Sequence, residues 1–360
     1  MILGACLALL AYAQAGYGLL LALLTRGRSE PAAPPLPAEL PTVSLIIAAH
    51  READVITAKV HDALAQDWPR HRLEVVVACD GSPDDTPARA RAAGADRVLE
   101  LPWGGKVAAQ DAAVRVARGE VLAFSDANAR WEPGALRALV ARLLAPDVGL
   151  VAGRVTFTGG ETNQEGLYWR LEMWLRERES VLHSITAGNG AIYAVRRAAY
   201  HPGDPVMGHD LRLPTEVVRA GFRAVDEPAA RATERMVPTV EGEWRRKRRM
   251  MSHAWPIVLR GGLLDPRGLP APYLLALVSH RWLRYASPFL HLAALLASLR
   301  RPRALAAHAL VLALAAAPVR ARPALLARYY VLTTASIAFG LADHLRHGTP
   351  AGWSPPEGTR

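Results

Sequence analysis

Short apolar segments alternate with stretches of helical periodicity between residues 42 and 144, and this alternation restricts the fold more than any other feature. The run Val43–Ala49 is continuously apolar, as expected of a strand buried on both faces. Strands that alternate with helices form a parallel α/β sheet, which we therefore predict here. The other predicted strands are Leu73–Cys79, Arg97–Leu101 and Val121–Ser125, and the predicted helices are Val55–Gln66, Pro87–Ala93, Lys106–Ala117 and Pro133–Leu144.

Two polar motifs stand where predicted strands end, which is where ligands bind in such sheets. Asp126-Ala127-Asn128 carries two oxygen side chains that can hold one hard cation, Mg2+ or Mn2+, shared with substrate phosphates. Asp80-Gly81-Ser82 carries a carboxylate that can accept hydrogen bonds from a base or a ribose. Both motifs are also ordinary turn sequences, so the residues alone leave two interpretations open.

Three further motifs carry charged groups suited to phosphate or proton chemistry. Lys106 follows a glycine pair and opens a helix, where phosphate binds readily; a solvated lysine is the alternative. Arg246 and Arg249 share one helix face and can hold a diphosphate, unless the run Arg245–Arg249 is a patch facing anionic lipid. Asp210 precedes a predicted helix and is a candidate general base or a helix N-cap.

Charge and cysteine content exclude several classes of protein. The formal net charge of +10 would suit nucleic acid, but residues 244–360 hold 17 basic and 3 acidic residues. The rest of the chain is therefore net acidic, and we expect no nucleic-acid partner. Two cysteines, Cys6 and Cys79, cannot build a disulfide framework or a multi-cysteine zinc site.

The apolar run Ile2–Leu24 has 23 residues without a formal charge, which is enough to span a bilayer. Arg26 and Arg28 follow it, so the positive-inside rule places the downstream chain in the cytoplasm. A cleaved signal peptide ending at Ala11-Tyr12-Ala13 is the alternative, although the run continues past that point without a basic start.

Arginine-rich pieces separate three more apolar runs in the last third of the chain, and an amphipathic segment, Tyr273–Arg284, precedes them. These runs are Ala286–Leu299, Ala304–Val319 and Tyr329–Leu341. We expect a transmembrane anchor at 1–25, a proline-rich linker at 26–41, a catalytic α/β domain at 42–255, an amphipathic interface segment at 256–285, membrane helices at 286–345 and a tail at 346–360.

The order of the motifs from Val43 to about Trp255 resembles glycosyltransferase family 2, the inverting enzymes with a GT-A fold. The segments that carry the resemblance are Val43–Glu52, Cys79–Thr86, Gly104–Lys106, Gly119–Val121, Asp126–Ala129, Thr186–Arg197 and Gly208–Asp210. Ser279-His280-Arg281 and Trp353-Ser354-Pro355 also look like membrane-bound bacterial members. The resemblance implies a GT-A (Rossmann-like) nucleotide-sugar-binding domain flanked by transmembrane or interfacial helices.

The resemblance also implies roles for individual residues. Nucleotide binding would involve Ala48, Glu52, Asp80, Lys106, Asp126, Arg246 and Arg249. Asp80 would face the base, and the two arginines would neutralise the leaving diphosphate. Asp126 and Asn128 would hold Mg2+ or Mn2+, and Asp210 would be the general base. The acceptor side would include Gly188, Asn189 and His209.

Several positions depart from the family pattern. Asn128 replaces a second aspartate, and His209 replaces an acidic residue before the base. Arg246 and Met250 replace the Gln and Trp of a Gln-x-x-Arg-Trp helix, which argues against a processive polymerase.

The resemblance thus implies a membrane-bound inverting glycosyltransferase that moves a sugar from a nucleotide-sugar, with UDP-sugar favoured, to a lipid-linked or glycan acceptor. We expect it in the bacterial inner membrane, in contact with membrane lipid and with its catalytic domain facing the cytoplasm. The departures at residues 128 and 209 motivate an alternative, a catalytically degenerate membrane scaffold that binds nucleotide. A nucleotidyltransferase on a similar sheet is a third possibility.

Overall fold

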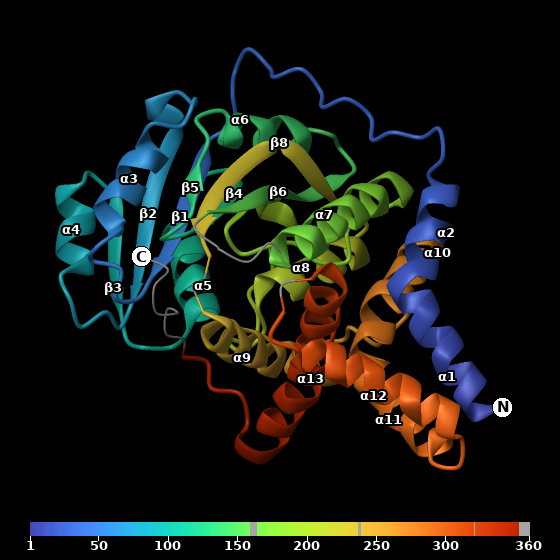
Figure 1. Ribbon diagram of the computed structural model, residues 1–360. Coiled ribbons are helices and arrows are strands. Elements are labelled where there is room, and N and C mark those ends of the chain that lie inside the picture. Colours follow the sequence, from blue (N-terminus) through green and yellow to red (C-terminus); the bar gives the residue numbers. More distant parts are fainter. Residues whose placement is uncertain (159–163, 237–238, 320, 353–360) are drawn as a thin grey trace.

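The computed structural model describes residues 1–158, 164–236, 239–319 and 321–352. An α/β body with one central sheet occupies most of the chain, and a group of terminal helices stands beside it (Figure 1). The predicted tail at 346–360 is therefore described only as far as Gly352, and Trp353-Ser354-Pro355 lies outside the described residues.

Eight strands form the sheet in the order β3-β2-β1-β4-β7-β6-β8-β5. Their bounds are β1 Val43–Ala49, β2 Leu73–Asp80, β3 Arg97–Leu101, β4 Val121–Asp126, β5 Arg130–Trp131, β6 Val148–Thr158, β7 Ile192–Arg196 and β8 Arg223–Arg235. Strands β3, β2, β1 and β4 are parallel, whereas β7 runs antiparallel to both β4 and β6, and β5 runs antiparallel to β8. The predicted parallel arrangement is therefore confirmed for the four strands that the sequence pattern identified, and the antiparallel strands belong to the part of the sheet for which no strand was predicted.

Thirteen α-helices surround the sheet and form the terminal group within the described residues. They are α1 Ile2–Ala11, α2 Tyr17–Leu24, α3 Ile56–Leu64, α4 Thr86–Ala92, α5 Lys106–Val116, α6 Ala135–Leu143, α7 Gln164–Leu182, α8 His209–Arg219, α9 Val240–Leu259, α10 Ala271–Ala276, α11 Leu283–Ser298, α12 Pro302–Ala316 and α13 Arg322–His347. Helix α9 runs without a break through the predicted boundary between residues 255 and 256.

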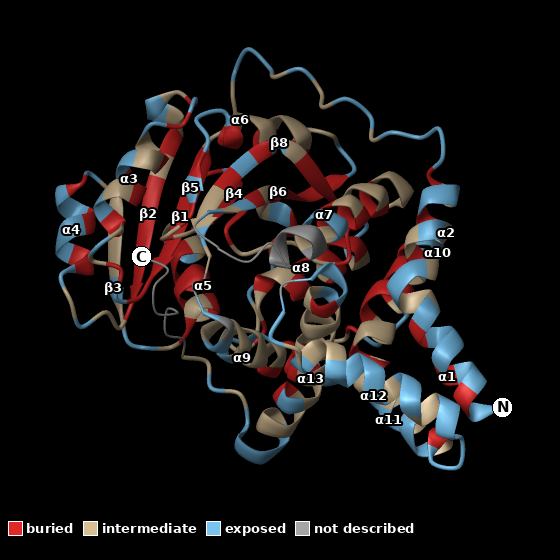
Figure 2. Ribbon diagram, viewed as in Figure 1, coloured by how far each residue is buried: buried red, intermediate tan, exposed pale blue. Residues whose placement is uncertain are grey.

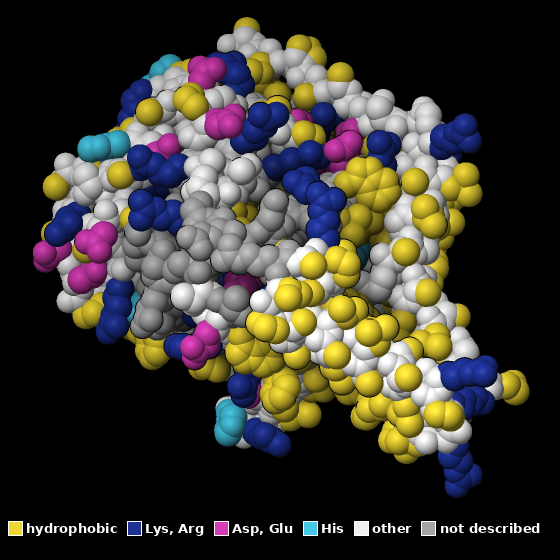
Figure 3. Space-filling view, in the orientation of Figure 1, with side chains coloured by type: hydrophobic (Ala, Val, Ile, Leu, Met, Phe, Trp, Pro, Cys, Tyr) yellow, Lys and Arg dark blue, Asp and Glu magenta, His cyan; other side chains and the backbone are white. Residues whose placement is uncertain are grey.

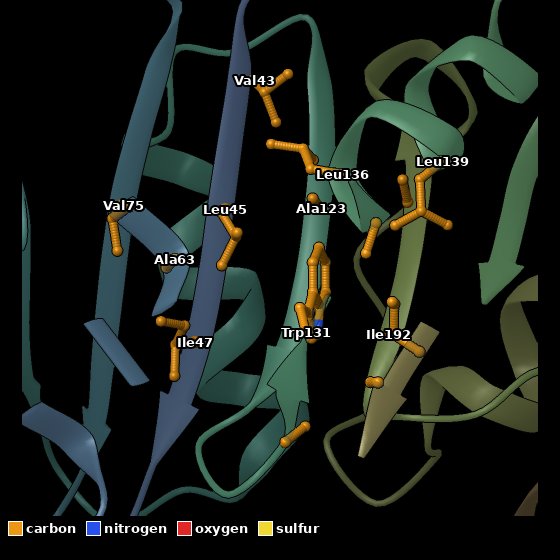
Figure 4. Close-up of a cluster of buried hydrophobic side chains, with 14 of the residues drawn as sticks. Val43, Leu45, Ile47, Ala63, Val75, Ala123, Trp131, Leu136, Leu139 and Ile192 are labelled. Carbon is orange, nitrogen blue, oxygen red and sulfur yellow. The ribbon is translucent and has the colours of Figure 1, made fainter. Parts of the chain in front are cut away.

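The core lies on both faces of the sheet because every residue of β1 is buried. Leu45 and Ile47 point to the face covered by α3 and α6, where they join Trp131 and Leu136 in one apolar cluster (Figure 4). The intervening residues of β1, with α5 and α8, form a second cluster on the opposite face. Burying one such side chain fully contributes about 1.5–3 kcal/mol, so β1 is firmly held in the sheet between β2 and β4.

The terminal helices expose much more apolar surface than the sheet (Figures 2 and 3). By length and composition, two helical segments could cross a membrane within the described residues, Ile2–Leu24 and Arg322–His347. Helix α12 is apolar but shorter. Helices α1 and α11 pack together, and α12 packs against α13.

Helix α13 is held tightly against α9. A Cβ atom at Gly340 would lie 2.6 Å from the Cβ of Met251, so only glycine allows this approach of the two backbones. The Trp255 indole donates to the carbonyl of Ile337 at 2.9 Å, and the Arg248 guanidinium makes two 2.6 Å hydrogen bonds to the Asp343 carboxylate. The two helices therefore form one unit.

The segment predicted to be an amphipathic interface helix is largely enclosed by protein. His280 and Arg281, which the sequence pattern assigns to its polar face, are buried. His280 lies 2.7 Å from the Glu179 carboxylate, and Arg281 donates to Glu172 at 3.1 Å, both on α7. Charges that look solvent-facing in the sequence are thus used to join the terminal helices to the α/β body.

Candidate functional site

One cavity of about 520 Å3 collects most of the residues that the sequence singled out. Its walls come from the ends of β4 and β8, the start of α5 and α8, the loop before β7, and α9. The predicted site residues that line it are Glu52, Lys106, Asp126, Asn128, Gly188, Asn189, His209, Asp210, Arg246 and Arg249. Ala48 and Asp80 are not among the lining residues.

Asp126 and Asn128 lie where β4 ends, as predicted, and face the same cavity. The Lys106 ammonium, at the first residue of α5, pairs with the Asp126 carboxylate. Burial alone would lower the pKa of Lys106, but the Asp126 carboxylate outweighs it and the pKa is raised. The pair places a cation and two oxygen donors within one small volume, which suits the binding of a phosphate and its counterion.

These oxygen donors fit a divalent cation of the Mg2+ or Mn2+ type. No group of three or more His, Cys, Asp or Glu side chains placed to share one ion is found in the described residues. Asp126 and Asn128 would therefore supply only part of a coordination shell. This is the arrangement expected of an ion that shares its remaining positions with substrate phosphates and water.

Lys59 contacts the loop that carries the metal motif, and no sequence pattern predicts this contact. It is fully buried, and its ammonium donates to the carbonyl of Ala129 at 2.8 Å and to the Asp62 carboxylate at 3.1 Å. Burial lowers the pKa of Lys59 to about 8. The buried Lys59 ammonium thus links the loop after Asp126 to α3.

Asp80 and Ala48 are buried and do not line the cavity. The buried Asp80 carboxylate accepts the backbone amides of Gly104 at 2.7 Å and Gly105 at 3.0 Å. Ala48 is buried within β1. The Asp80 carboxylate therefore accepts hydrogen bonds from the loop that leads into Lys106. The family resemblance implies instead that it faces the base of the nucleotide.

Asp210 lies in the first turn of α8, with its side chain directed into the cavity. Its carbonyl accepts the backbone amide of Gly188 at 2.7 Å, which ties the loop before β7 to the start of α8. Removal of solvent raises the pKa of the Asp210 carboxyl, although the Lys106 ammonium opposes this shift. A carboxylate with a raised pKa facing a cavity is a candidate proton acceptor.

Asn189 and His209 line the cavity but are also held from within. The Asn189 amide donates to the Gly153 carbonyl at 2.7 Å and accepts the Ile192 amide at 2.9 Å, which closes the turn into β7. His209 Nδ1 lies 2.7 Å from the Tyr193 hydroxyl. Burial lowers the pKa of His209 well below its ordinary value, so the ring is neutral. His209, which stands where the family pattern has an acidic residue, is thus a buried packing residue.

Arg246 and Arg249 face the cavity from one side of α9, as their spacing predicted. The Arg246 guanidinium makes hydrogen bonds of 2.7 and 2.9 Å to the Glu243 carboxylate. Burial lowers the pKa of Arg249, and the charge of Arg246 lowers it further. Two neighbouring cations that repel one another gain from an anion placed between them. By contrast, Arg245 points outward and pairs with Glu241.

Glu234, at the end of β8, also faces the cavity, and sequence reasoning missed it. Burial raises its pKa to about 7, and the Asp126 carboxylate contributes to the increase. Its Oε1 atom is buried without a hydrogen-bond partner among the described residues. The pairing of β5 with β8 brings Glu234 near the metal motif, and no local sequence signal indicates that pairing.

The cavity extends from these groups toward the terminal helices. Its far end is lined by side chains of α11 and α13: Arg284, Tyr285, Tyr329, Thr333 and Ser336. The cavity therefore extends from Asp210 to α13, one of the two described segments that are long and apolar enough to cross a membrane.

Comparison with known proteins adds the family context. Residues 44–201 match the model of glycosyl transferase family 2. The chain is 31% identical over 124 residues to glycosyltransferase AglE of Haloferax volcanii, and 27% identical over 175 residues to the beta-monoglucosyldiacylglycerol synthase of Trichormus variabilis. The first alignment covers 33% of this chain and 41% of the Haloferax protein, and the second covers 44% of this chain and 36% of the Trichormus protein. The chain thus spans about two fifths of the length of the curated relatives that it matches.

A solved structure is similar over nearly the whole chain. The mannosyltransferase PcManGT of Pyrobaculum calidifontis, in complex with GDP-Man and Mn2+, shares 25% identity with a TM-score of 0.75. The likeness covers 96% of this chain and 99% of the mannosyltransferase chain. The predicted GT-A fold is confirmed by this match, which includes the terminal helices as well as the sheet.

Proposed function

Residues 44–201 match glycosyl transferase family 2, and on this basis we propose that the chain is a membrane-bound inverting glycosyltransferase. It takes a sugar from a nucleotide-sugar and transfers it to a lipid-linked or glycan acceptor. The single observation that carries the proposal is the shared cavity, where the candidate base, the oxygen donors and the basic side chains of α9 meet.

The reaction is one displacement at the anomeric carbon. Asp210 accepts the proton of the acceptor hydroxyl while that oxygen attacks the sugar, and the nucleoside diphosphate leaves from the opposite side. Such in-line attack inverts the configuration of the sugar. Base catalysis by a positioned carboxylate contributes about 10²–10⁴-fold, and the raised pKa of Asp210 improves its match to a hydroxyl proton.

Arg246, Arg249 and Lys106 bind the diphosphate and stabilise the negative charge that grows on it as the sugar leaves. Asp126 and Asn128 would hold Mg2+ or Mn2+ against the same phosphates, and the ion would supply further charge neutralisation there. One similar structure is a mannosyltransferase bound to GDP-Man and Mn2+, so GDP-sugars are candidate donors beside the UDP-sugars that the family resemblance favours.

The acceptor enters from the far end of the cavity, past Tyr285 and Tyr329. A lipid-linked acceptor fits this route, because α11 and α13 form its walls and are rich in exposed apolar side chains. One relative is named a beta-monoglucosyldiacylglycerol synthase, which is consistent with a lipid acceptor. The segments Ile2–Leu24 and Arg322–His347 would hold the enzyme in the bacterial inner membrane, with the catalytic domain on the cytoplasmic side.

A panel of labelled nucleotide-sugars tests the proposal. Membranes containing the full chain are incubated with UDP- and GDP-linked sugars, with and without EDTA, and products are separated into lipid-soluble and water-soluble fractions. We expect transfer from one donor class that stops with EDTA and returns with Mn2+. Nucleotide binding without transfer from any donor would contradict the proposal and favour a catalytically degenerate scaffold.

A further inference from the structure

Residues 348–352, the described part of the chain after α13, return to the nucleotide end of the cavity. The chain turns at Gly348 and rises beside α9 toward α5 (Figure 1). We call residues 349–352 the strap. The Thr349 hydroxyl donates to the carbonyl of Ser252 on α9 at 3.0 Å, and His344 Nδ1 lies 2.9 Å from the same hydroxyl. The strap is therefore anchored at its first residue to the α9–α13 unit.

The far end of the strap packs on the loop before α5. A Cβ atom at Gly105 would lie 2.2 Å from the carbonyl oxygen of Ala351, and Gly105 also has a φ of +99°. A Cβ atom at Gly352 would lie 2.3 Å from the ring of Trp103. A side chain at 105 would collide with the backbone of Ala351 and force the loop and the strap apart, and a side chain at 352 would displace the ring of Trp103.

This loop is the one that the Asp80 carboxylate holds through the amides of Gly104 and Gly105. It leads directly into Lys106, and Ala351 lines the same cavity as Lys106 and Asp126. The loop is consequently fixed from two sides, by Asp80 from within the sheet and by the strap from outside.

We propose that the strap forms one wall of the nucleotide pocket and positions the donor, so that residues 349–352 belong to the donor site. The inference rests on the proposed function, because it deepens the donor site assigned there. The wall holds the loop of Trp103 and Gly105 in the conformation that presents Lys106 to the diphosphate. Removing the wall weakens donor binding, whereas the base and the acceptor route are left in place.

Gly352→Ala tests the wall, because the added methyl group collides with Trp103. The matched control is Gly134→Ala, since nothing lies within 4 Å of a Cβ atom at that glycine. Thr349→Val is a milder second variant that removes the hydroxyl anchor to Ser252. The full-length proteins in detergent are titrated with GDP and with UDP in the presence of Mn2+, and KM and kcat are measured with the active donor.

We expect Gly352→Ala to raise the nucleotide Kd and the donor KM about tenfold, equivalent to about 1.4 kcal/mol, with kcat changed less than about threefold. Thr349→Val should shift the same constants in the same direction by a smaller factor, and Gly134→Ala should leave them unchanged. A lower KM in Gly352→Ala would mean that the strap blocks the pocket, and an unchanged KM would mean that it is packing only; either result overturns the inference. Wild-type protein that binds neither nucleotide overturns the proposed function itself.

Discussion

Replacing Asp210 by asparagine removes the candidate base with little change in shape. The backbone amides of Asp210 and Leu211 favour the charged carboxylate and lower its pKa, and an asparagine oxygen can face the same amides. The carbonyl that accepts from Gly188 is untouched. We therefore expect the fold and the nucleotide site to survive, with nucleotide Kd within about threefold of the wild type.

The rate of the chemical step should fall by the factor that a positioned base contributes. That contribution is about 10²–10⁴-fold, which corresponds to about 3–5 kcal/mol in the activation barrier. Single-turnover transfer with the active labelled donor measures this loss, and nucleotide titration measures binding in the same preparation. Asp147→Asn is the matched control, because Asp147 is half-exposed and pairs with Arg223.

The pH dependence of kcat tests the same prediction independently. Desolvation raises the pKa of Asp210, so the deprotonated base is lost as the pH falls through that raised value. Wild-type kcat should therefore fall on the acid side at a pH above the ordinary range of a carboxyl, and the Asp210→Asn variant should lack that limb. Transfer within threefold of the wild type would refute the assignment, as would a Kd that rises as much as the rate falls.

Three other perturbations have defined outcomes. Asn128→Asp should tighten the binding of Mn2+ in the presence of nucleotide by about tenfold, and Asn128→Ala should weaken it by about tenfold, because the charge and number of the ligands set the affinity. Calorimetry measures both affinities, and equal values would contradict the metal assignment. Burial lowers the pKa of Lys59 to about 8 from its ordinary 10.5, so the unfolded chain binds more protons between these values and stability rises with pH there. Melting curves should show that rise in the wild type and not in Lys59→Met. Tyr193→Phe leaves the buried Nδ1 of His209 without its partner and should cost about 1–3 kcal/mol of stability, detected as a lower Tm; an unchanged Tm would rule out that role.

The first four strands and the motifs at their ends could be predicted because the information is local. Val43–Ala49 and its neighbours are short apolar runs, and the parallel connection brings their carboxyl ends together. Asp126, Asn128 and Lys106 therefore meet as expected. Arg246 and Arg249 also share a face because helical spacing is regular.

What could not be predicted depends on contacts between distant segments. Strand β7 is antiparallel to its neighbours because of the path that the chain takes through α7. The residues of β7 themselves do not indicate this direction. Glu234 reaches the metal motif through the pairing of β5 with β8. His280 and Arg281 look like interface charges until their carboxylate partners on α7 are placed. Tertiary pairing decided each of these cases.

The close packing of α13 on α9 has a consequence for how the enzyme would respond to its lipid surroundings. A helix of 26 residues is about 39 Å long, while the hydrocarbon core of a bilayer is about 30 Å thick. If α13 crosses the bilayer, it adapts to this mismatch by tilting, and its tilt changes with bilayer thickness. Because Gly340 and Ile337 tie it rigidly to α9, the helix that carries Arg246 and Arg249 would tilt with it. Acyl-chain length would thereby adjust the geometry of the diphosphate site.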